Sequence, residues 1–141
     1  MIKITNLSKK YGNFKALKSI SFKIDKGEIV GFLGANGAGK STTLKIITGY
    51  LSPTSGKVSI NNYDVSTHSL EIQSMIGYLP EHNPLYEEMK VYDYLRFMSN
   101  IRGIKDGEFD TAVKKVISEC SLYEVIHKNI SECSKGFKQR I

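Results

Sequence analysis

Apolar and polar residues alternate in two short segments near the amino terminus, at residues 2–5 and 20–24. Alternation with a period of two puts one set of side chains in a core and the other in solvent, as in strands of an antiparallel sheet. Turn-forming residues follow each segment, at 11–13 and 25–27. The pattern therefore predicts two antiparallel strands, each buried on one face.

Residues 29–33 have a different pattern, because Ile29, Val30, Gly31, Phe32 and Leu33 form an uninterrupted apolar run. Such a run is typical of a strand that is buried on both faces, as parallel strands are beneath crossover helices. We therefore expect a buried strand here, which leads directly into a glycine-rich turn.

The next segments predict a helix, a strand and a turn. Residues 57–60 alternate as a strand, and Asn61-Asn62 is a plausible turn after it. The order of strand, turn, helix and strand indicates α/β organisation. Before Pro53, apolar residues recur at helical spacing: Leu44, Ile46, Ile47 and Leu51.

Two amphipathic helices are predicted in the second half of the chain. They indicate a helical subdomain at residues 81–141, beside an antiparallel β and α/β part at residues 1–80. The apolar stripe of the first helix consists of Val91, Leu95, Met98 and Ile101, and that of the second of Phe109, Ala112, Val113, Val116, Ile117 and Cys120.

The composition is that of a globular protein, with 141 residues, 40% hydrophobic and 24% charged residues. No run approaches the roughly 18 apolar residues that a membrane span needs, and no secretory pattern opens the chain. We therefore expect a cytoplasmic protein. Cys120 and Cys133 lack metal-binding spacing, so we interpret them as structural thiols.

The formal charge of +6 raises the possibility of a nucleic-acid partner. However, the lysines are dispersed, and they adjoin only at Lys9-Lys10 and Lys114-Lys115. No arginine-rich stripe alternates with aromatic residues, so a solvated surface is the better interpretation and no nucleic acid is expected. Nucleotide phosphates are a better candidate polyanion.

Residues 34–41 read Gly-Ala-Asn-Gly-Ala-Gly-Lys-Ser and satisfy the phosphate-loop pattern GxxxxGK[ST] between a strand and a helix. Gly34, Gly37 and Gly39 lack a Cβ atom, so the backbone can wrap around phosphate oxygens and present successive N–H groups. The amino end of the following helix adds partial positive charge. The spacing does not fit a dinucleotide-binding fingerprint or a kinase loop.

The side chains after the loop fit a nucleotide with Mg²⁺. Lys40 should reach the β- and γ-phosphates, and the Ser41 hydroxyl can bind Mg²⁺. Thr42 can donate to the α-phosphate, although helix capping or back-bonding to the preceding turn is an alternative. These residues predict a domain that binds a magnesium–nucleotide complex.

Three more segments resemble motifs of ABC transporter ATP-binding subunits. Tyr11-Gly12 resembles the A-loop, residues 77–81 (Gly-Tyr-Leu-Pro-Glu) the Q-loop, and residues 133–140 (Cys-Ser-Lys-Gly-Phe-Lys-Gln-Arg) the signature motif. The likeness extends over nearly the whole chain. It implies an α/β P-loop NTPase fold, with a RecA-like core, an antiparallel β subdomain and a helical subdomain.

The resemblance also implies roles for particular residues. Tyr11 would stack on adenine, and Glu81, which stands where the family usually has glutamine, would contact Mg²⁺ and the attacking water. Lys40, Glu81 and Ser134 are the implied catalytic residues, and Ser41 and Glu81 the implied metal ligands. The implied ATP-binding residues are Tyr11, Gly34, Asn36, Gly37, Ala38, Gly39, Lys40, Ser41, Thr42, Ser134 and Gly136.

The signature Leu-Ser-Gly-Gly-Gln is altered here to Cys133-Ser134-Lys135-Gly136-Phe137. Ser134 can still donate its hydroxyl, and Gly136 still lets a backbone N–H approach a phosphate. The resemblance implies that both serve the γ-phosphate of ATP held by a second ATP-binding subunit, in a head-to-tail homodimer or heterodimer. Cys133 in place of leucine changes the local packing.

Residues 79–86 look like ATP-binding subunits of ABC-2-type exporters, most of all the gliding-motility-associated subunit. This narrower likeness implies a transmembrane permease as partner, in contact with residues 83–89, and a location at the inner face of the cell membrane. The transported substrate is not encoded in these residues.

The family's Walker B aspartate, catalytic glutamate, D-loop and switch histidine have no counterpart in residues 1–141. We therefore expect part of an ABC exporter's ATP-binding subunit, a P-loop ATPase that in its full-length form hydrolyses ATP to drive export through a membrane partner. Residues 1–141 lack the carboxy-terminal part of its core, so alone they are expected to bind ATP without hydrolysing it. We expect residues 29–33 to lack neighbouring strands and the chain to fold poorly alone. The alternatives are a non-hydrolysing nucleotide-binding fragment and an ABC-type ATPase that acts on ribosomes or DNA.

Overall fold

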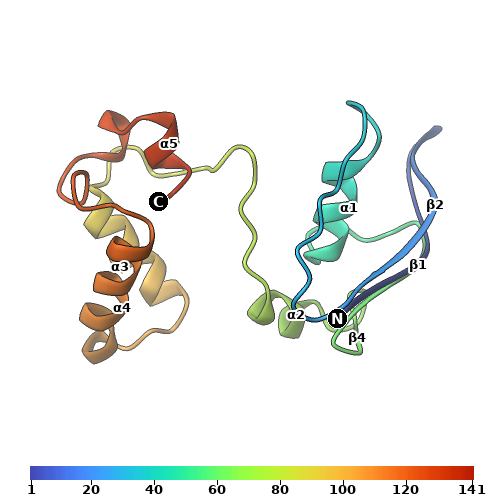
Figure 1. The fold of residues 1–141 in the computed structure, drawn as a ribbon, viewed down its shortest axis with the longest axis horizontal. Coiled ribbons are helices and arrows are strands. Elements are labelled where there is room, and N and C mark those ends of the chain that lie inside the picture. Colours follow the sequence, from blue (N-terminus) through green and yellow to red (C-terminus); the bar gives the residue numbers. More distant parts are fainter. The chain divides into compact units, whose positions relative to one another are not determined.

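The computed structural model describes residues 1–141, which divide into two compact units, Met1–Tyr78 and Leu79–Ile141 (Figure 1). Each unit has its own cluster of buried apolar residues. The division lies close to residue 80, where the sequence pattern changes from α/β to helical. None of the helices combines the length and the apolar character that crossing a bilayer requires.

The first unit contains a four-stranded antiparallel sheet in the order β2-β1-β3-β4 (Figure 1). The two-residue turn Gly12-Asn13 joins the first two strands, and Asn61-Asn62 joins the last two with φ of 48° and 71°. Both predicted antiparallel strands and both turns are thereby confirmed. The strands are β1 (Ile2–Tyr11), β2 (Phe14–Ile24), β3 (Ser55–Ile60) and β4 (Tyr63–Asp64).

The core of this unit lies between one face of the sheet and two short helices, α1 (Lys40–Ile47) and α2 (Ser69–Met75). Ile4 stands opposite Phe22 on one side and Val58 on the other, so inward-facing positions of three strands meet in register. The buried members are Ile4, Leu7, Leu17, Ile46, Ile47, Val58, Ile60, Val65 and Ile72.

Helix α1 is shorter than the apolar spacing predicts. Gly49 takes φ of 72°, a left-handed conformation that favours glycine, and its N–H donates to Ile46 O. The amides of Tyr50 and Leu51 both donate to Lys45 O. The chain therefore turns after Ile47, and Leu51 packs against the core from outside the helix.

The expectation of a buried strand at residues 29–33 is wrong for this structure. The segment pairs with no strand, and Ile29 and Leu33 are 102% and 93% exposed. A strand is stable only when its backbone N–H and C=O groups are hydrogen-bonded to a neighbouring strand. The sheet of this unit contains β2, β1, β3 and β4, and none of them pairs with residues 29–33. Phe32 contacts the sheet, with its ring centroid 5.6 Å from that of Phe22.

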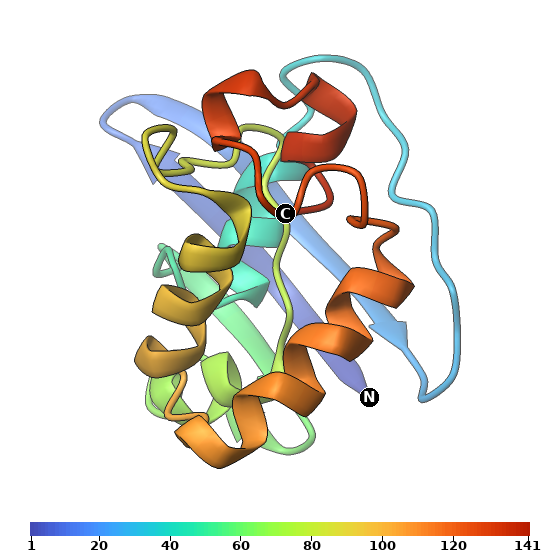
Figure 2. The ribbon, with the colours of Figure 1, turned by 90° about the vertical axis from the view of Figure 1, so that its left-hand side faces the viewer.

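The second unit is helical, as its two apolar stripes predict. Helices α3 (Val91–Ile101) and α4 (Asp106–Glu119) are followed by the 3-10 turn Ile130–Glu132 and the short helix α5 (Lys135–Lys138) (Figure 2). The core joins α3 to the segment before α5 and includes Cys133, which is 7% exposed. Its buried members are Val91, Tyr94, Leu122, Val125, Ile126, Ile130 and Cys133.

Backbone hydrogen bonds fasten the segment before α3 to the segment before α5. Val91 N donates to Lys128 O and Ile130 N donates to Met89 O, at 3.0 and 2.9 Å. Ser131 N donates to Glu87 O at 3.0 Å. The loop that precedes α3 and the turn that carries α5 therefore form one hydrogen-bonded structure.

Candidate nucleotide-binding site

The glycine-rich loop at residues 34–39 leads directly into α1, as the phosphate-loop pattern requires. Gly37 and Gly39 have φ of 81° and 87°, which are left-handed conformations that side chains disfavour. Ala38 N donates to Ala35 O at 3.1 Å and closes a turn around the exposed Asn36. Gly34, Asn36, Gly37 and Ala38 are all exposed, so the concave backbone is open to a ligand.

Gly39 also makes the closest approach between the loop and the sheet. A Cβ atom at this position would overlap Leu17 Cδ2 and would lie 2.7 Å from the carbonyl oxygen of Ala16. Leu17 is buried in the core of the first unit. The loop is therefore held against β2 at a point where only glycine fits.

The start of α1 leaves backbone donors free for an anion. Its first backbone hydrogen bond runs from Thr43 N to Gly39 O at 2.9 Å, and Thr43 Oγ1 donates to the same oxygen at 3.0 Å. The amides of Lys40, Ser41 and Thr42 precede that bond and have no helical acceptor. Thr43 is fully buried and anchors this turn, a structural role that the motif pattern does not indicate.

Lys40 lies within the loop. Its Nζ donates to Gly34 O at 2.6 Å and to Ala35 O at 2.8 Å. An ammonium group has three N–H donors, so one remains free while the loop is in this conformation. The positive charge is therefore already positioned over the backbone that would surround a phosphate group.

A cleft of about 380 Å³ lies between β2 and the loop. Gly37 and Ala38 line one side, and the β2 residues Lys15 and Lys18 line the other. The motif pattern does not identify these two lysines, because their position depends on the pairing of β2 and not on the spacing of loop residues. The other lining residues are Phe14, Ala16, Leu17 and Ile20.

Tyr11 ends β1 and is 50% exposed, which leaves much of its ring accessible. It pairs with Phe14 across the hairpin turn, and Lys9 Nζ lies 5.3 Å from its ring centroid. A cation near an aromatic face is favourable. Tyr11 is thus placed at the same end of the hairpin as Phe14, which lines the cleft beside the loop.

Glu81, Ser134 and Gly136 belong to the second unit, so the structure does not bring them together with residues 34–42 as one body. Glu81 is exposed, and its carbonyl oxygen accepts from Gln139 Nε2 at 2.8 Å. Ser134 Oγ accepts from Phe137 N at 3.3 Å and caps α5, which leaves its hydroxyl proton free. Gly136 is exposed.

The family model described as ABC transporter matches residues 17–141. The chain belongs to the ABC transporter family. This family binds ATP, typically with Mg²⁺, and has P-loop ATPase activity. The phosphate loop, α1 and both regions that resemble the Q-loop and signature motif lie within the matched residues.

One curated relative of this ABC transporter domain is an uncharacterized ABC transporter ATP-binding protein of Methanocaldococcus jannaschii. It is 37% identical over 140 residues, which cover 99% of the chain and 49% of the relative. The chain thus spans about half the length of that protein.

Two solved structures agree with the family fold. One is the structure of an ATP-binding subunit of an ABC transporter, with a TM-score of 0.84, 32% identity, and coverage of 99% of this chain and 58% of that one. The other is a dimeric post-hydrolysis state of an ATP-binding cassette bound to ADP and Pi, with a TM-score of 0.84, 25% identity, and coverage of 99% and 66%. The α/β P-loop NTPase fold with a helical subdomain is therefore confirmed.

The residues of the loop fit a nucleotide with Mg²⁺. Unpaired amides at the start of α1 suit phosphate oxygens, and Lys40 supplies a compensating positive charge. Ser41 is exposed at the first turn of α1, and a hydroxyl oxygen is a suitable ligand for a hard cation. Bound Mg²⁺ would neutralise phosphate charge beside this hydroxyl.

Proposed function

We propose that this chain is the nucleotide-binding part of an ATP-binding subunit of an ABC-2-type exporter, similar to the gliding-motility-associated subunit. The observation that carries the proposal is the set of free amides at residues 40–42, beside the Lys40 ammonium group. Positive charge and N–H donors converge there with no acidic side chain in residues 29–63. A nucleoside triphosphate bound to Mg²⁺ has the complementary charge.

Each residue of the loop has a distinct role in this proposal. Lys40 moves from the carbonyl oxygens of Gly34 and Ala35 to the β- and γ-phosphates, Ser41 binds Mg²⁺, and Thr42 donates to the α-phosphate. The backbone of Gly34, Asn36, Gly37, Ala38 and Gly39 surrounds the phosphate chain. Tyr11 stacks on adenine, since its ring is half exposed at the end of the hairpin.

The second unit acts on nucleotide in a head-to-tail dimer. Ser134 already uses one lone pair to cap α5, and its free proton can be donated to a γ-phosphate held by the other subunit. Gly136 offers a backbone N–H without a side chain in the way. Glu81 contributes a carboxylate to Mg²⁺ and the attacking water, and its backbone is fixed by Gln139.

A transmembrane permease is the partner, and it contacts residues 83–89 at the inner face of the membrane. Tyr86 is 57% exposed and packs on α3, with ring centroids 5.5 Å from Phe97 and 6.2 Å from Tyr94. Exposed aromatic residues are common at protein interfaces. The backbone amides of Ile130 and Ser131 donate to the carbonyl oxygens of Met89 and Glu87, and these bonds connect this surface to the segment that carries α5.

Calorimetry with MgATP tests the nucleotide site. We expect Lys40→Ala to weaken binding at least tenfold, about 1.4 kcal/mol, because it removes the ammonium group from the loop. Lys45→Ala is the matched control, since Lys45 is exposed in the last turn of the same helix. Equal affinities of the two variants would contradict the assignment of residues 34–42 as the ATP site.

We further propose that residues 1–141 alone bind MgATP without hydrolysing it. Phosphoryl transfer needs more than the contact of Glu81 with the attacking water, and residues 1–141 have no counterpart of the family's Walker B aspartate, catalytic glutamate or switch histidine. A phosphate-release assay on the wild-type chain at saturating MgATP is expected to show no turnover above background. Turnover that Lys40→Ala abolishes would refute this part of the proposal.

A further inference from the structure

The first 24 residues carry six lysines and no acidic residue. Two of the six have a polar partner: Lys9 Nζ donates to Ser52 O at 2.7 Å, and Lys23 Nζ lies 2.7 Å from Asp25. The hairpin of β1 and β2 is therefore a strongly positive surface. The other four of these six lysines have no hydrogen bond or ion pair at the ammonium group: Lys3, Lys10, Lys15 and Lys18.

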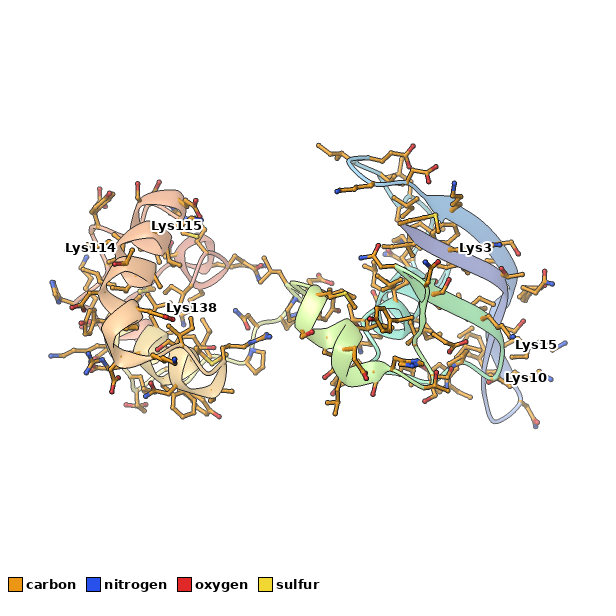
Figure 3. The ribbon with its side chains drawn as sticks, turned by 90° about the horizontal axis from the view of Figure 1, so that it is seen from below. Lys3, Lys10, Lys15, Lys114, Lys115 and Lys138 are labelled. Carbon is orange, nitrogen blue, oxygen red and sulfur yellow. The ribbon has the colours of Figure 1, made fainter.

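Three of these lysines line a single groove of about 680 Å³, which we call the lysine groove. Lys10 comes from β1, and Lys15 and Lys18 come from β2. Lys10 and Lys15 extend from the sheet on the side away from α1, as Lys3 does (Figure 3). The remaining lining residues are Ser8, Leu17, Ser19, Thr54 and Ser55, so no residue of the phosphate loop takes part.

The hydroxyl groups of the lysine groove are available as donors. Ser8 Oγ accepts from Ser19 N, and Thr54 Oγ1 accepts from Lys10 N, each at 3.0 Å. Because each oxygen already accepts a backbone proton, its own O–H can point into the groove. The groove thus combines ammonium and hydroxyl donors with no carboxylate, a combination that suits the oxygens of a phosphate group.

The strand register supplies a second reason to expect an anion. Lys10 and Lys15 are direct cross-strand partners in the hairpin. Like charges directly opposite each other on neighbouring strands are destabilising. A bound anion would offset that repulsion, and a ligand that binds only the folded hairpin would stabilise it.

We propose that the lysine groove binds phosphate ester groups. Lys15 and Lys18 also line the cleft beside the phosphate loop, whereas Lys10 lines the groove alone, so Lys10→Gln by itself should already weaken binding of the probe. Phosphate esters on lipid headgroups and on soluble molecules have the same chemistry, so two kinds of probe are needed to distinguish these sources. The proposal does not depend on ATP binding, and it is best tested in the Lys40→Ala background, in which the phosphate loop is impaired.

The test compares two triple variants that remove equal charge. Lys10→Gln, Lys15→Gln and Lys18→Gln alter the groove, whereas Lys3→Gln, Lys57→Gln and Lys114→Gln alter exposed lysines elsewhere. One probe is vesicles of phosphatidylcholine with phosphatidylglycerol, against phosphatidylcholine alone, measured by co-sedimentation. The other probe is soluble inositol hexakisphosphate, measured by calorimetry.

Each lysine near an anionic surface contributes roughly fivefold to binding affinity, so removal of three should weaken binding by about 100-fold. We expect the groove variant to show this loss with at least one probe. The control variant should keep most of its binding, and arginine at the three groove positions should restore it because the charge returns. The probe that responds identifies the source. Equal losses in both triple variants, or no binding of either probe, would overturn the proposal.

Discussion

Substitution of Gly39 by alanine should destabilise the first unit more than substitution of Gly37. Both glycines have nearly the same left-handed φ, 87° and 81°, so alanine is strained at either position by about 1–2 kcal/mol. Their surroundings differ, because a Cβ at Gly37 meets nothing within 4 Å, whereas a Cβ at Gly39 overlaps Leu17 and approaches the backbone of Ala16. The pair therefore separates backbone strain from steric overlap.

The additional effect at Gly39 comes from atoms that cannot move freely. The Ala16 oxygen, 2.7 Å from the added Cβ, is a backbone atom of β2, and Leu17 is 4% exposed. Overpacking of this kind typically adds about 1–3 kcal/mol. We therefore expect a loss of about 2–5 kcal/mol for Gly39→Ala, against about 1–2 kcal/mol for Gly37→Ala.

Urea unfolding followed by far-UV circular dichroism measures both variants against the wild type. A stability difference changes the midpoint, and an unchanged slope shows that the same surface is exposed on unfolding. The reasoning would be refuted if Gly39→Ala were no less stable than Gly37→Ala. Such a result would mean that β2 and the phosphate loop are not held together at Gly39.

Two further predictions concern the second unit. Burial, and then the neighbouring Tyr86, raise the pKa of Tyr94 above its ordinary value of 10.0. The tyrosine therefore ionises in the unfolded chain first, and the free energy of unfolding should fall as the pH rises above 10. Urea unfolding at several pH values measures this decline, which should be smaller in Tyr94→Phe. A decline of equal size in Tyr94→Phe would exclude this cause. Ser134→Ala removes the cap of α5 and should raise the rate of hydrogen exchange at Phe137 N, by an amount equivalent to about 1 kcal/mol. Ser134→Asn keeps a capping side chain and should preserve the protection of this amide. Equal exchange rates in the two variants would show that the cap does not stabilise α5.

Local sequence pattern predicted the parts of the fold that depend on near neighbours. The two strands of the hairpin, the turn at Asn61-Asn62 and the helices α3 and α4 all follow from periodicity and turn chemistry. The structure of residues 29–33 was not predicted correctly, although the apolar run of this segment is pronounced. Its structure depends on strands that would lie beside it, and periodicity carries no information on whether such strands are present.

In the candidate site, too, some residues are indicated by local sequence and others depend on how distant segments pair. The positions of Gly34 to Thr42 could be predicted because the motif's chemistry is local, a loop followed by the start of a helix. Lys15 and Lys18 could not, since the register of β1 and β2 includes irregular steps between residues 4 and 10 that no spacing rule indicates. The internal hydrogen bonds of Lys40 are also a property of the folded loop alone.

The phosphate loop keeps its open shape although residues 29–33 form no strand beneath it. Two other attachments account for this. On one side, Gly39 packs against Ala16 and Leu17 of β2. On the other, Thr43 directs both its backbone amide and its hydroxyl to Gly39 O, at 2.9 and 3.0 Å, and is itself fully buried.

Because both attachments meet at Gly39, the start of α1 is fixed to the antiparallel sheet through one residue. The amides of residues 40–42 are then oriented by the helix and do not depend on the preceding strand. Nucleotide binding by residues 34–42 should therefore tolerate changes at Ile29 or Leu33, which are almost fully exposed. It should not tolerate changes that shift β2 relative to α1.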